Sequence, residues 1–392
     1  MKKRDAFLCL MAMLMTLGVT SCKICNGRDT GKEDPFVEED SCITSPPITY
    51  NFYIENSGSM MGYFSGNGTS DLETLISQYH DRLTEDDFEG DTVTLNYINT
   101  SIEPSNEDLF KYLKSAKSKC TESYTKIDEI LKMAMKDVDD NKVNIVISDY
   151  SFESDFGNLM TAQSHITKLF TQQINTNKAL SVAIIKYMVN FSGNYFPGRI
   201  PCKKAMPIYF WIFGNAQQVK KLSELRVKTN NCGVVLLQTE QTFDSEIKIK
   251  NARAVNNENE IIVDQWEKDR YDQQYYANVT VDLSNTIIRD NDLMNKDSYQ
   301  IESSSSSIYN IESIIKNEEY YTFRIQTDRP SPGRLSISYP LILPQWVENY
   351  SFEGNGLPPD SATFGIKHLI GGVFDAYAQK SNKYFVFNIT LK

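Results

Sequence analysis

Apolar runs alternate with amphipathic segments from residue 49 to residue 239, and this alternation restricts the possible folds more than any other feature. Strand-like runs separated by helical ones are the pattern of an α/β sheet with helices packed on its faces. The run 142–148 is nearly continuous in apolar character at its end, as a central parallel strand requires. We expect strands over residues 50–54, 92–98, 142–148, 180–187, 207–213 and 233–237. We expect helices over residues 70–83, 124–138, 165–173 and 215–225.

The stretch 190–206 interrupts this alternation. It contains two glycines and two prolines and has no helical period. Two parallel neighbouring strands normally require a helical crossover between them. The stretch is therefore either a long loop or an antiparallel hairpin arm, and the strand order beyond residue 180 stays open.

Beyond residue 243 the chain changes to short alternating segments separated by turn-rich stretches. Half-buried strands are expected at residues 246–250, 277–281, 321–325, 334–338 and 384–389. One helix is expected there, over residues 364–377. This pattern predicts a β-sandwich of the immunoglobulin-like kind. Because the chain is longer than one core usually holds, we expect two domains, an α/β domain at 48–240 and the sandwich at 241–392.

The first 21 residues have the layout of a signal peptide. Basic residues at positions 2–4 precede an apolar core at 6–19, which is too short to span a bilayer permanently. The sequence Val-Thr-Ser-Cys that ends at Cys22 resembles a bacterial lipoprotein cleavage box. The resemblance implies that residues 1–21 are removed and that Cys22 carries the lipid. An ordinary signal peptide cleaved nearby is the alternative.

Residues 22–47 are polar, carry an acidic cluster at 38–40 and show no apolar period, so they predict a flexible tether. Acyl chains on Cys22 would hold the protein to a membrane without spanning it. The expected location is the cell envelope of a diderm bacterium, as an outer-membrane or cell-surface lipoprotein. The charged stretch 32–34 is the kind of signal that directs such proteins to the outer face.

The charge and the small number of histidines exclude several classes of function. The net charge of −11 becomes −13 without residues 1–21, which contribute three basic residues and one acidic one. A chain this acidic repels nucleic-acid phosphates, so we expect no nucleic-acid partner. Only three histidines occur, and CxxC spacing occurs only at Cys22 and Cys25. These counts argue against a zinc site and against histidine-based catalysis.

Oxygen-bearing side chains follow the first predicted strand. Glu55, Ser57 and Ser59 stand at alternating positions on the turn that leaves this strand. A carboxylate and two hydroxyls so placed lie within reach of one hard cation such as Mg²⁺. Two later positions are comparable, since Thr125 opens the helix at 124–138 and Asp149 ends the strand at 142–148.

These three segments resemble the metal loops of the von Willebrand factor A-type (vWA) domain. The family's first loop reads Asp-x-Ser-Gly-Ser, its second supplies a Thr before an amphipathic helix, and its third is a Ser-Asp-Gly turn. Here Glu55 stands in the place of the first Asp, and Tyr150 in the place of the Gly. The resemblance implies a Rossmann-like, doubly wound, mostly parallel sheet with a metal-ion-dependent adhesion site (MIDAS). Its implied ligands for Mg²⁺ (or Mn²⁺ or Ca²⁺) are Glu55, Ser57, Ser59, Thr125 and Asp149.

The resemblance implies binding of a protein partner, in adhesion or complex assembly, with an acidic side chain of the partner completing the metal shell. Because Glu55 is one methylene longer than Asp, a metal-free vWA scaffold in a cell-envelope assembly is the alternative. A hydrolase built on Ser57 or Ser59 would need a base and a G-x-S-x-G elbow, which the chain lacks, so we expect no enzyme. The aromatic stretch 190–196 either anchors the partner beside the site or packs beneath its own loop.

Overall fold

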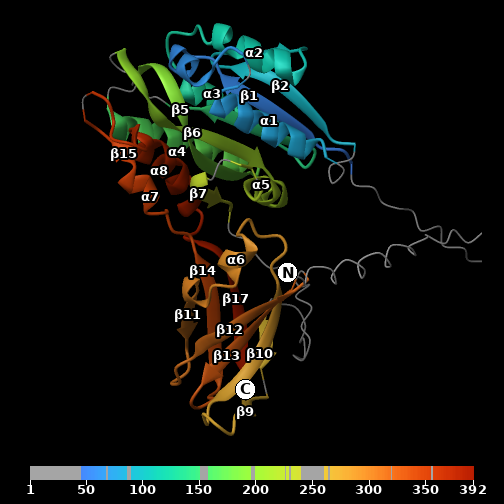
Figure 1. The fold of residues 1–392 in the computed structure, drawn as a ribbon. Helices are drawn as coiled ribbons and strands as arrows, with labels where there is room; N and C mark the ends of the chain where they lie inside the picture. Colours follow the sequence, from blue (N-terminus) through green and yellow to red (C-terminus); the bar gives the residue numbers. More distant parts are fainter. Residues whose placement is uncertain are drawn as a thin grey trace, which may run out of the picture. The chain divides into compact units, whose positions relative to one another are not determined.

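The strand that carries Glu55 lies inside a seven-stranded sheet of order β3-β2-β1-β4-β6-β5-β7 (Figure 1). Its strands are β1 (Thr49–Glu55), β2 (Thr92–Ile98), β3 (Ile102–Ser105), β4 (Lys142–Ser148), β5 (Ser181–Tyr195), β6 (Ile200–Gly214) and β7 (Asn231–Leu237). β1 pairs in parallel with both β2 and β4, and the other neighbouring pairs are antiparallel. Four strands, β1, β2, β4 and β5, therefore share one direction. The chain is thus a mixed α/β fold, as expected.

The computed structural model describes residues 46–392 apart from residues 68, 86–89, 151–157, 196–198, 226, 229–230, 240–259, 264, 319 and 355. The predicted signal peptide, Cys22 and nearly all of the predicted tether lie outside the described residues. By their internal contacts, residues 46–392 group as one unit. Within the described part of this unit, no helix is both long and apolar enough to cross a membrane.

The four helices predicted before residue 240 are confirmed, with changes of up to three residues at their ends except at α4, which begins six residues earlier than predicted. α1 (Asp71–Leu83) begins with the expected capping box, in which the Ser70 hydroxyl accepts the Glu73 amide and the Glu73 carboxylate accepts the Ser70 amide. α3 (Ile127–Lys136), α4 (Leu159–Thr176) and α5 (Ala216–Ser223) match the other expected helices. α2 (Leu109–Lys119), capped by Asp108, has no predicted counterpart.

The described residues of the stretch 190–206 form an antiparallel hairpin arm, which decides between the two alternatives. β5 and β6 pair without interruption from Ser181 opposite Gly214 to Tyr195 opposite Ile200. β6 also pairs antiparallel with β4, so it lies between β4 and β5 in the sheet. A hairpin connection needs no crossover helix, so the β5–β6 connection places no helix on this half of the sheet.

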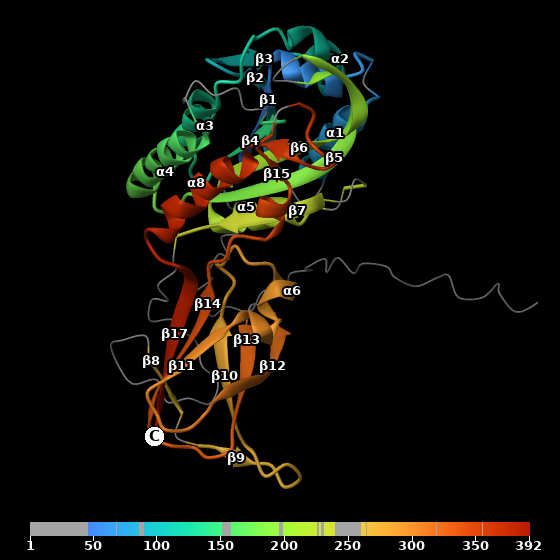
Figure 2. The same ribbon diagram turned by 90° about the vertical axis from the view of Figure 1, so that its left-hand side faces the viewer.

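Helices cover the two faces of the sheet (Figure 2). On one face, the Phe213 ring of β6 lies 6.4 Å from the Phe170 ring of α4. On the other face, the Phe210 ring lies 4.9 Å from the Tyr79 ring of α1. α3 lies on the same side as α4, and α2 on the same side as α1, since the Tyr112 ring of α2 lies 4.7 Å from the Tyr97 ring of β2.

A helix near the C-terminal end of the chain packs on the face of the sheet to which the β5–β6 hairpin brings no helix. α8 (Ile366–Ala378) packs against α4 on the face that carries Trp211 and Phe213 (Figure 2). The two helices approach closely at Gly372, where a Cβ atom would lie 2.7 Å from the Gln163 carbonyl oxygen. The Tyr377 hydroxyl donates to the Leu180 carbonyl oxygen at 3.0 Å. Residues expected in the second domain therefore complete the core of the first.

The segment before α8 also lies on the first sheet. It contains α7 (Trp346–Asn349) and two short strands, β15 (Ser351–Phe352) and β16 (Thr363–Phe364). The Trp346 ring lies on Gly233, whose Cβ would come within 2.6 Å of it. The fully buried Lys186 ammonium donates to the Ser361 carbonyl oxygen at 2.5 Å and lies 3.6 Å from the Tyr350 ring centroid. Burial lowers the pKa of Lys186 to about 8.

The remaining strands form two four-stranded sheets of order β12-β13-β10-β9 and β11-β14-β17-β8. These strands are β8 (Glu260–Val263), β9 (Glu267–Lys268), β10 (Tyr275–Asp282), β11 (Gln300–Ser303), β12 (Asn310–Asn317), β13 (Tyr320–Thr327), β14 (Gly333–Pro340) and β17 (Lys383–Leu391). All neighbouring pairs are antiparallel except β17 with β8. Rings from the two sheets meet, with Phe323 5.1 Å from Phe387. The strand expected at 246–250 lies outside the described residues.

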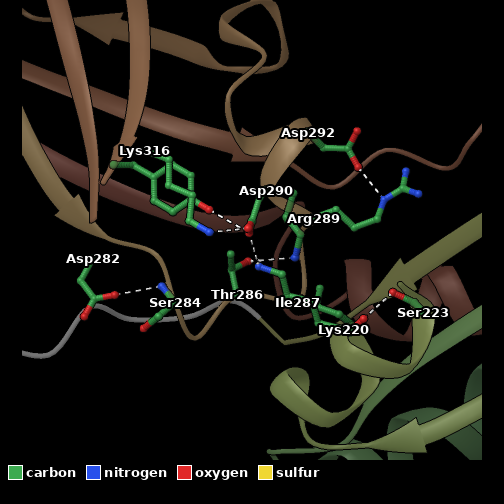
Figure 3. Close-up of polar contacts among 12 residues, drawn as sticks. Lys220, Ser223, Asp282, Ser284, Thr286, Ile287, Arg289, Asp290, Asp292 and Lys316 are labelled. Carbon is green, nitrogen blue, oxygen red and sulfur yellow. Dashed lines mark hydrogen bonds and ion pairs between the residues drawn. The ribbon is translucent and has the colours of Figure 1, made fainter. Parts of the chain in front are cut away.

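One carboxylate, that of Asp290, bonds both to a helix of the seven-stranded sheet and to strands of the four-stranded sheets (Figure 3). Asp290 opens the short helix α6 (Asp290–Leu293) and accepts from Lys220 of α5 at 2.7 Å and from the Tyr321 hydroxyl of β13 at 2.9 Å. Lys316 of β12 contacts its second oxygen. Burial by itself would raise the pKa of Asp290, but these three donors outweigh burial and hold the pKa well below its usual range.

Candidate metal centre

The candidate site lies where β1 and β4 end, at the switch point of the sheet. β2 lies on one side of β1 and β4 on the other, so the loops that leave β1 and β4 diverge. Such an edge is where open α/β sheets bind their ligands. Glu55 is the last residue of β1, and Asp149 directly follows β4. The structure brings all five predicted ligands together at this edge.

Hydrogen bonds link the five side chains in one continuous series. The Ser57 Oγ atom lies 2.9 Å from Ser59 Oγ and 3.1 Å from Thr125 Oγ1. At one end Ser59 Oγ donates to Asp149 Oδ1 at 3.2 Å. At the other end Thr125 Oγ1 donates to Glu55 Oε1 at 3.2 Å. Three hydroxyl oxygens are thus flanked by two carboxylates, and all but Thr125 are buried.

Backbone hydrogen bonds hold the first loop. The Asn56 amide donates to the Ile98 carbonyl at 3.2 Å, and the Gly58 amide donates to the Glu122 carbonyl at 2.8 Å. The 3₁₀ helix η1 (Gly58–Tyr63) then begins, with Ser57 at its N-cap position. The Ser57 side chain makes no capping bond, so its hydroxyl faces the other ligands instead of closing the helix end.

Asn99 holds the second loop, and sequence reasoning did not single it out. Its Oδ1 atom accepts the Lys126 amide at 3.0 Å, and its Nδ2 atom donates to the Tyr124 carbonyl at 2.9 Å. The two bonds bracket Thr125 and orient it toward Glu55. Asn99 directly follows β2, so its place at the carboxyl end of a parallel strand was the signal available in the sequence.

Glu55 is completely buried and is satisfied by several donors. Oε1 accepts the Ser57 amide at 2.8 Å as well as the Thr125 hydroxyl, and Oε2 accepts the Ser148 hydroxyl at 3.4 Å. Burial, and next the negative charge of Asp149, raise the pKa of Glu55 to about 8, although the hydrogen bonds act in the opposite direction. Two buried carboxyl groups this close together favour a bound proton or a bound cation.

Tyr150 has the backbone conformation that explains the glycine of the family motif. Its φ of 47° lies in the left-handed region, where glycine is unstrained and a bulky residue is rare. Its ring is fully buried and stacks on Trp211 at 4.7 Å, so it belongs to the core beneath the site. The Tyr150 hydroxyl and the Asn56 Oδ1 atom are two of the seven buried side-chain atoms that have no hydrogen-bond partner among the described residues.

The donor set suits a small hard cation. Octahedral Mg²⁺ holds oxygens at 2.0 to 2.1 Å, so adjacent ligands lie about 2.9 Å apart. The two separations around Ser57 Oγ, 2.9 and 3.1 Å, are close to this edge length. The set holds two carboxylates and three hydroxyls. A group of three or more His, Cys, Asp or Glu side chains that could hold a metal does not occur in the part of the chain that the structure describes.

The contacts described for the three histidines are with other side chains than the serines of the site. His80 lies beside Asp81 on α1, His165 lies 3.7 Å from Asp128, and His368 lies between Gln163 and Glu353. Ser57 and Ser59 instead contact each other, Thr125 and Asp149. The contacts described for these two serines are thus to hydroxyls and a carboxylate.

Apolar side chains are exposed next to the polar centre. Met61 follows Ser59 by two residues and is 41% exposed, and Tyr124 precedes Thr125 and is 55% exposed. Ile102, at the start of β3, is 37% exposed. The Lys126 ammonium lies 6.0 Å from the Tyr124 ring centroid.

Comparison with known proteins finds no matching family model, no matching curated protein and no matching solved structure.

Proposed function

We propose that residues 48–240, together with the C-terminal segment that covers them, form a vWA-type domain that binds a protein partner through a divalent cation. In this proposal the two further sheets are an immunoglobulin-like sandwich, and lipid on Cys22 holds the protein in the cell envelope. One observation carries the proposal: three hydroxyl oxygens from two separate loops lie at the spacing of cation ligands, between two carboxylates.

Ser57, Ser59 and Thr125 would hold the ion directly, and Glu55 and Asp149 would hold its waters. A bound ion would supply a Lewis-acidic centre that attracts a carboxylate. Because few of the direct ligands are charged, an acidic side chain of the partner is a suitable addition to the shell. The exposed Met61, Tyr124 and Ile102 would then form apolar contacts around that central bond, as interface residues commonly do.

The test is a titration of the full-length chain with Mg²⁺ and Mn²⁺, followed by calorimetry and by the thermal midpoint. We expect one ion to bind and to raise the midpoint, and Ser57→Ala combined with Ser59→Ala to abolish both effects. Ser118→Ala is the matched control, because that exposed hydroxyl of α2 donates only to the Ser115 carbonyl of its own helix. Absence of cation binding by the wild-type chain would contradict the metal part of the proposal.

A metal-free scaffold is the second candidate, and one observation favours it. Glu55 Oε1 already accepts both the Ser57 amide and the Thr125 hydroxyl, so the polar groups satisfy one another without an ion. In that case partner binding would be equal in Mg²⁺ and in a chelator. A loss of partner binding on chelation, restored by Mg²⁺, would rule the scaffold out.

A further inference from the structure

The β5–β6 arm touches the first metal loop at a pair of glycines. A Cβ atom at Gly62, in η1, would lie 2.3 Å from the Phe191 Cε2 atom of the arm. A Cβ atom at Gly193 would lie 2.9 Å from the Gly62 Cα atom. Real Cβ atoms do not approach other heavy atoms so closely, and the contact therefore requires glycine at both positions. The arm and the loop meet backbone against backbone.

Aromatic contacts hold the loop on either side of this pair. The Phe191 ring, 4% exposed, packs edge-on against the Tyr63 ring with centroids 4.8 Å apart. The Tyr63 hydroxyl donates to the Pro207 carbonyl of β6 at 2.9 Å. Both strands of the arm thus contact η1. The base of the arm is fixed in turn, because the Asn190 amide donates to Asp71 at the start of α1 at 3.0 Å.

The contact lies one turn away from a metal ligand. A 3₁₀ helix has three residues per turn, so residues three apart are stacked along its axis. Gly62 is therefore stacked on Ser59, whose hydroxyl bonds to Ser57 and Asp149. A displacement of η1 at Gly62 would be passed to the Ser59 hydroxyl through one turn of helix. Octahedral Mg²⁺ tolerates little displacement of its ligands.

We propose that Phe191 and Gly193 are positioning residues: the β5–β6 arm clamps η1 and thereby sets the Ser57 and Ser59 hydroxyls at the spacing of cation ligands. In the aromatic stretch, residues 191 and 193 thus act on the site through η1. Phe191 and Tyr195 are buried, which decides against their use as exposed partner anchors. The expected effect on cation binding rests on the proposed function, whereas the expected effect on the position of the loop does not.

The experiment is a double-mutant cycle on the full-length chain. Gly62→Ala places a methyl group against the Phe191 ring, and Phe191→Ala removes that ring. We expect Gly62→Ala to weaken Mn²⁺ binding on the order of tenfold and to speed amide hydrogen exchange in the peptide that spans residues 55–64. Phe191→Ala makes room for the methyl group, so the double variant should lose less than the sum of the losses of the two single variants. General destabilisation at two independent positions would instead make the two losses add.

Gly214→Ala is the matched control. Its Cβ would also be crowded, 2.9 Å from the Gln218 side chain, but Gly214 lies at the other end of β6 from the arm tip. This variant should leave exchange at 55–64 and Mn²⁺ binding unchanged. Equal exchange at 55–64 in wild type and Gly62→Ala, or losses that simply add in the double variant, would overturn the clamp. If the wild-type chain binds no Mn²⁺, the metal proposal fails, and the exchange measurement still decides the clamp.

Discussion

Glu55 Oε1 lies 3.2 Å from Thr125 Oγ1 and accepts a hydrogen bond from it, so the carboxylate at the end of β1 contacts one of the proposed ligand hydroxyls. An aspartate at this position would be one methylene shorter and would leave a gap between the two groups. A cation or one of its waters could occupy such a gap. The longer glutamate side chain instead fills this gap and accepts the Thr125 hydrogen bond itself.

Glu55→Asp is accordingly expected to tighten cation binding. The shorter carboxylate withdraws from Thr125 and takes the place that the vWA motif gives it, as a holder of metal-bound water. Changes in such outer-shell groups alter metal affinity on the order of tenfold, and calorimetric titration with Mg²⁺ would measure the gain. An unchanged or weaker affinity would show that the loop is built around glutamate. Glu129→Asp, at an exposed position on α3, is the control.

The stability of the metal-free chain should depend on pH through Glu55. Its pKa is raised from about 4.5 to about 8 by burial and by the charge of Asp149, so the folded state holds a proton that the unfolded state releases. The contribution is fully present below pH 4.5 and is lost as the pH rises to 8. Thermal midpoints in chelator should therefore fall more between pH 5 and pH 8 for wild type than for Glu55→Gln, which mimics the protonated form. Parallel curves for the two proteins would mean that Glu55 is ionised throughout.

The strands, and the meeting of the five proposed ligand side chains at one edge of the sheet, were predictable because both depend on local pattern. Alternating apolar residues mark β1, β2 and β4, and the carboxyl ends of parallel strands meet at one edge, which brings Glu55, Thr125 and Asp149 together. β3 was missed because it has only four residues, includes Pro104 and is largely exposed. The contact of Gly62 with Phe191 was not predictable, since it depends on the path of a hairpin arm that joins the sheet far along the chain.

The role of the C-terminal segment was also beyond a local pattern. The helix at 364–377 was expected, and α8 confirms it with a shift of one or two residues. Its amphipathic spacing says that one face is buried but not against which sheet. The β5–β6 hairpin brings no helix to the face of the sheet that carries Trp211 and Phe213, and α8 packs there against α4 rather than on the two four-stranded sheets.

Cys22 should carry the lipid anchor that the cleavage box implies. Cells grown with an alkyne analogue of palmitate should yield a labelled wild-type protein and an unlabelled Cys22→Ala variant, because only the cysteine of the box is acylated. Cys25→Ala, three residues further on, should be labelled like wild type. Equal labelling of wild type and Cys22→Ala would place the lipid elsewhere, and no labelling of either protein would favour an ordinary signal peptide.

Two adjacent glycines of α8 should respond oppositely to the same substitution. A Cβ at Gly372 would lie 2.7 Å from the Gln163 carbonyl oxygen and 3.0 Å from Ile166 Cβ, so Gly372→Ala must push α8 away from α4. Overpacking of this kind costs about 1 to 3 kcal/mol in the free energy of unfolding. At Gly371 the nearest atom would be 3.4 Å away, an ordinary contact, and Gly371→Ala should stabilise by up to about 1 kcal/mol, because alanine favours the helix. Thermal unfolding of the two variants would measure the difference, and equal effects would mean that α8 does not pack on α4 through Gly372.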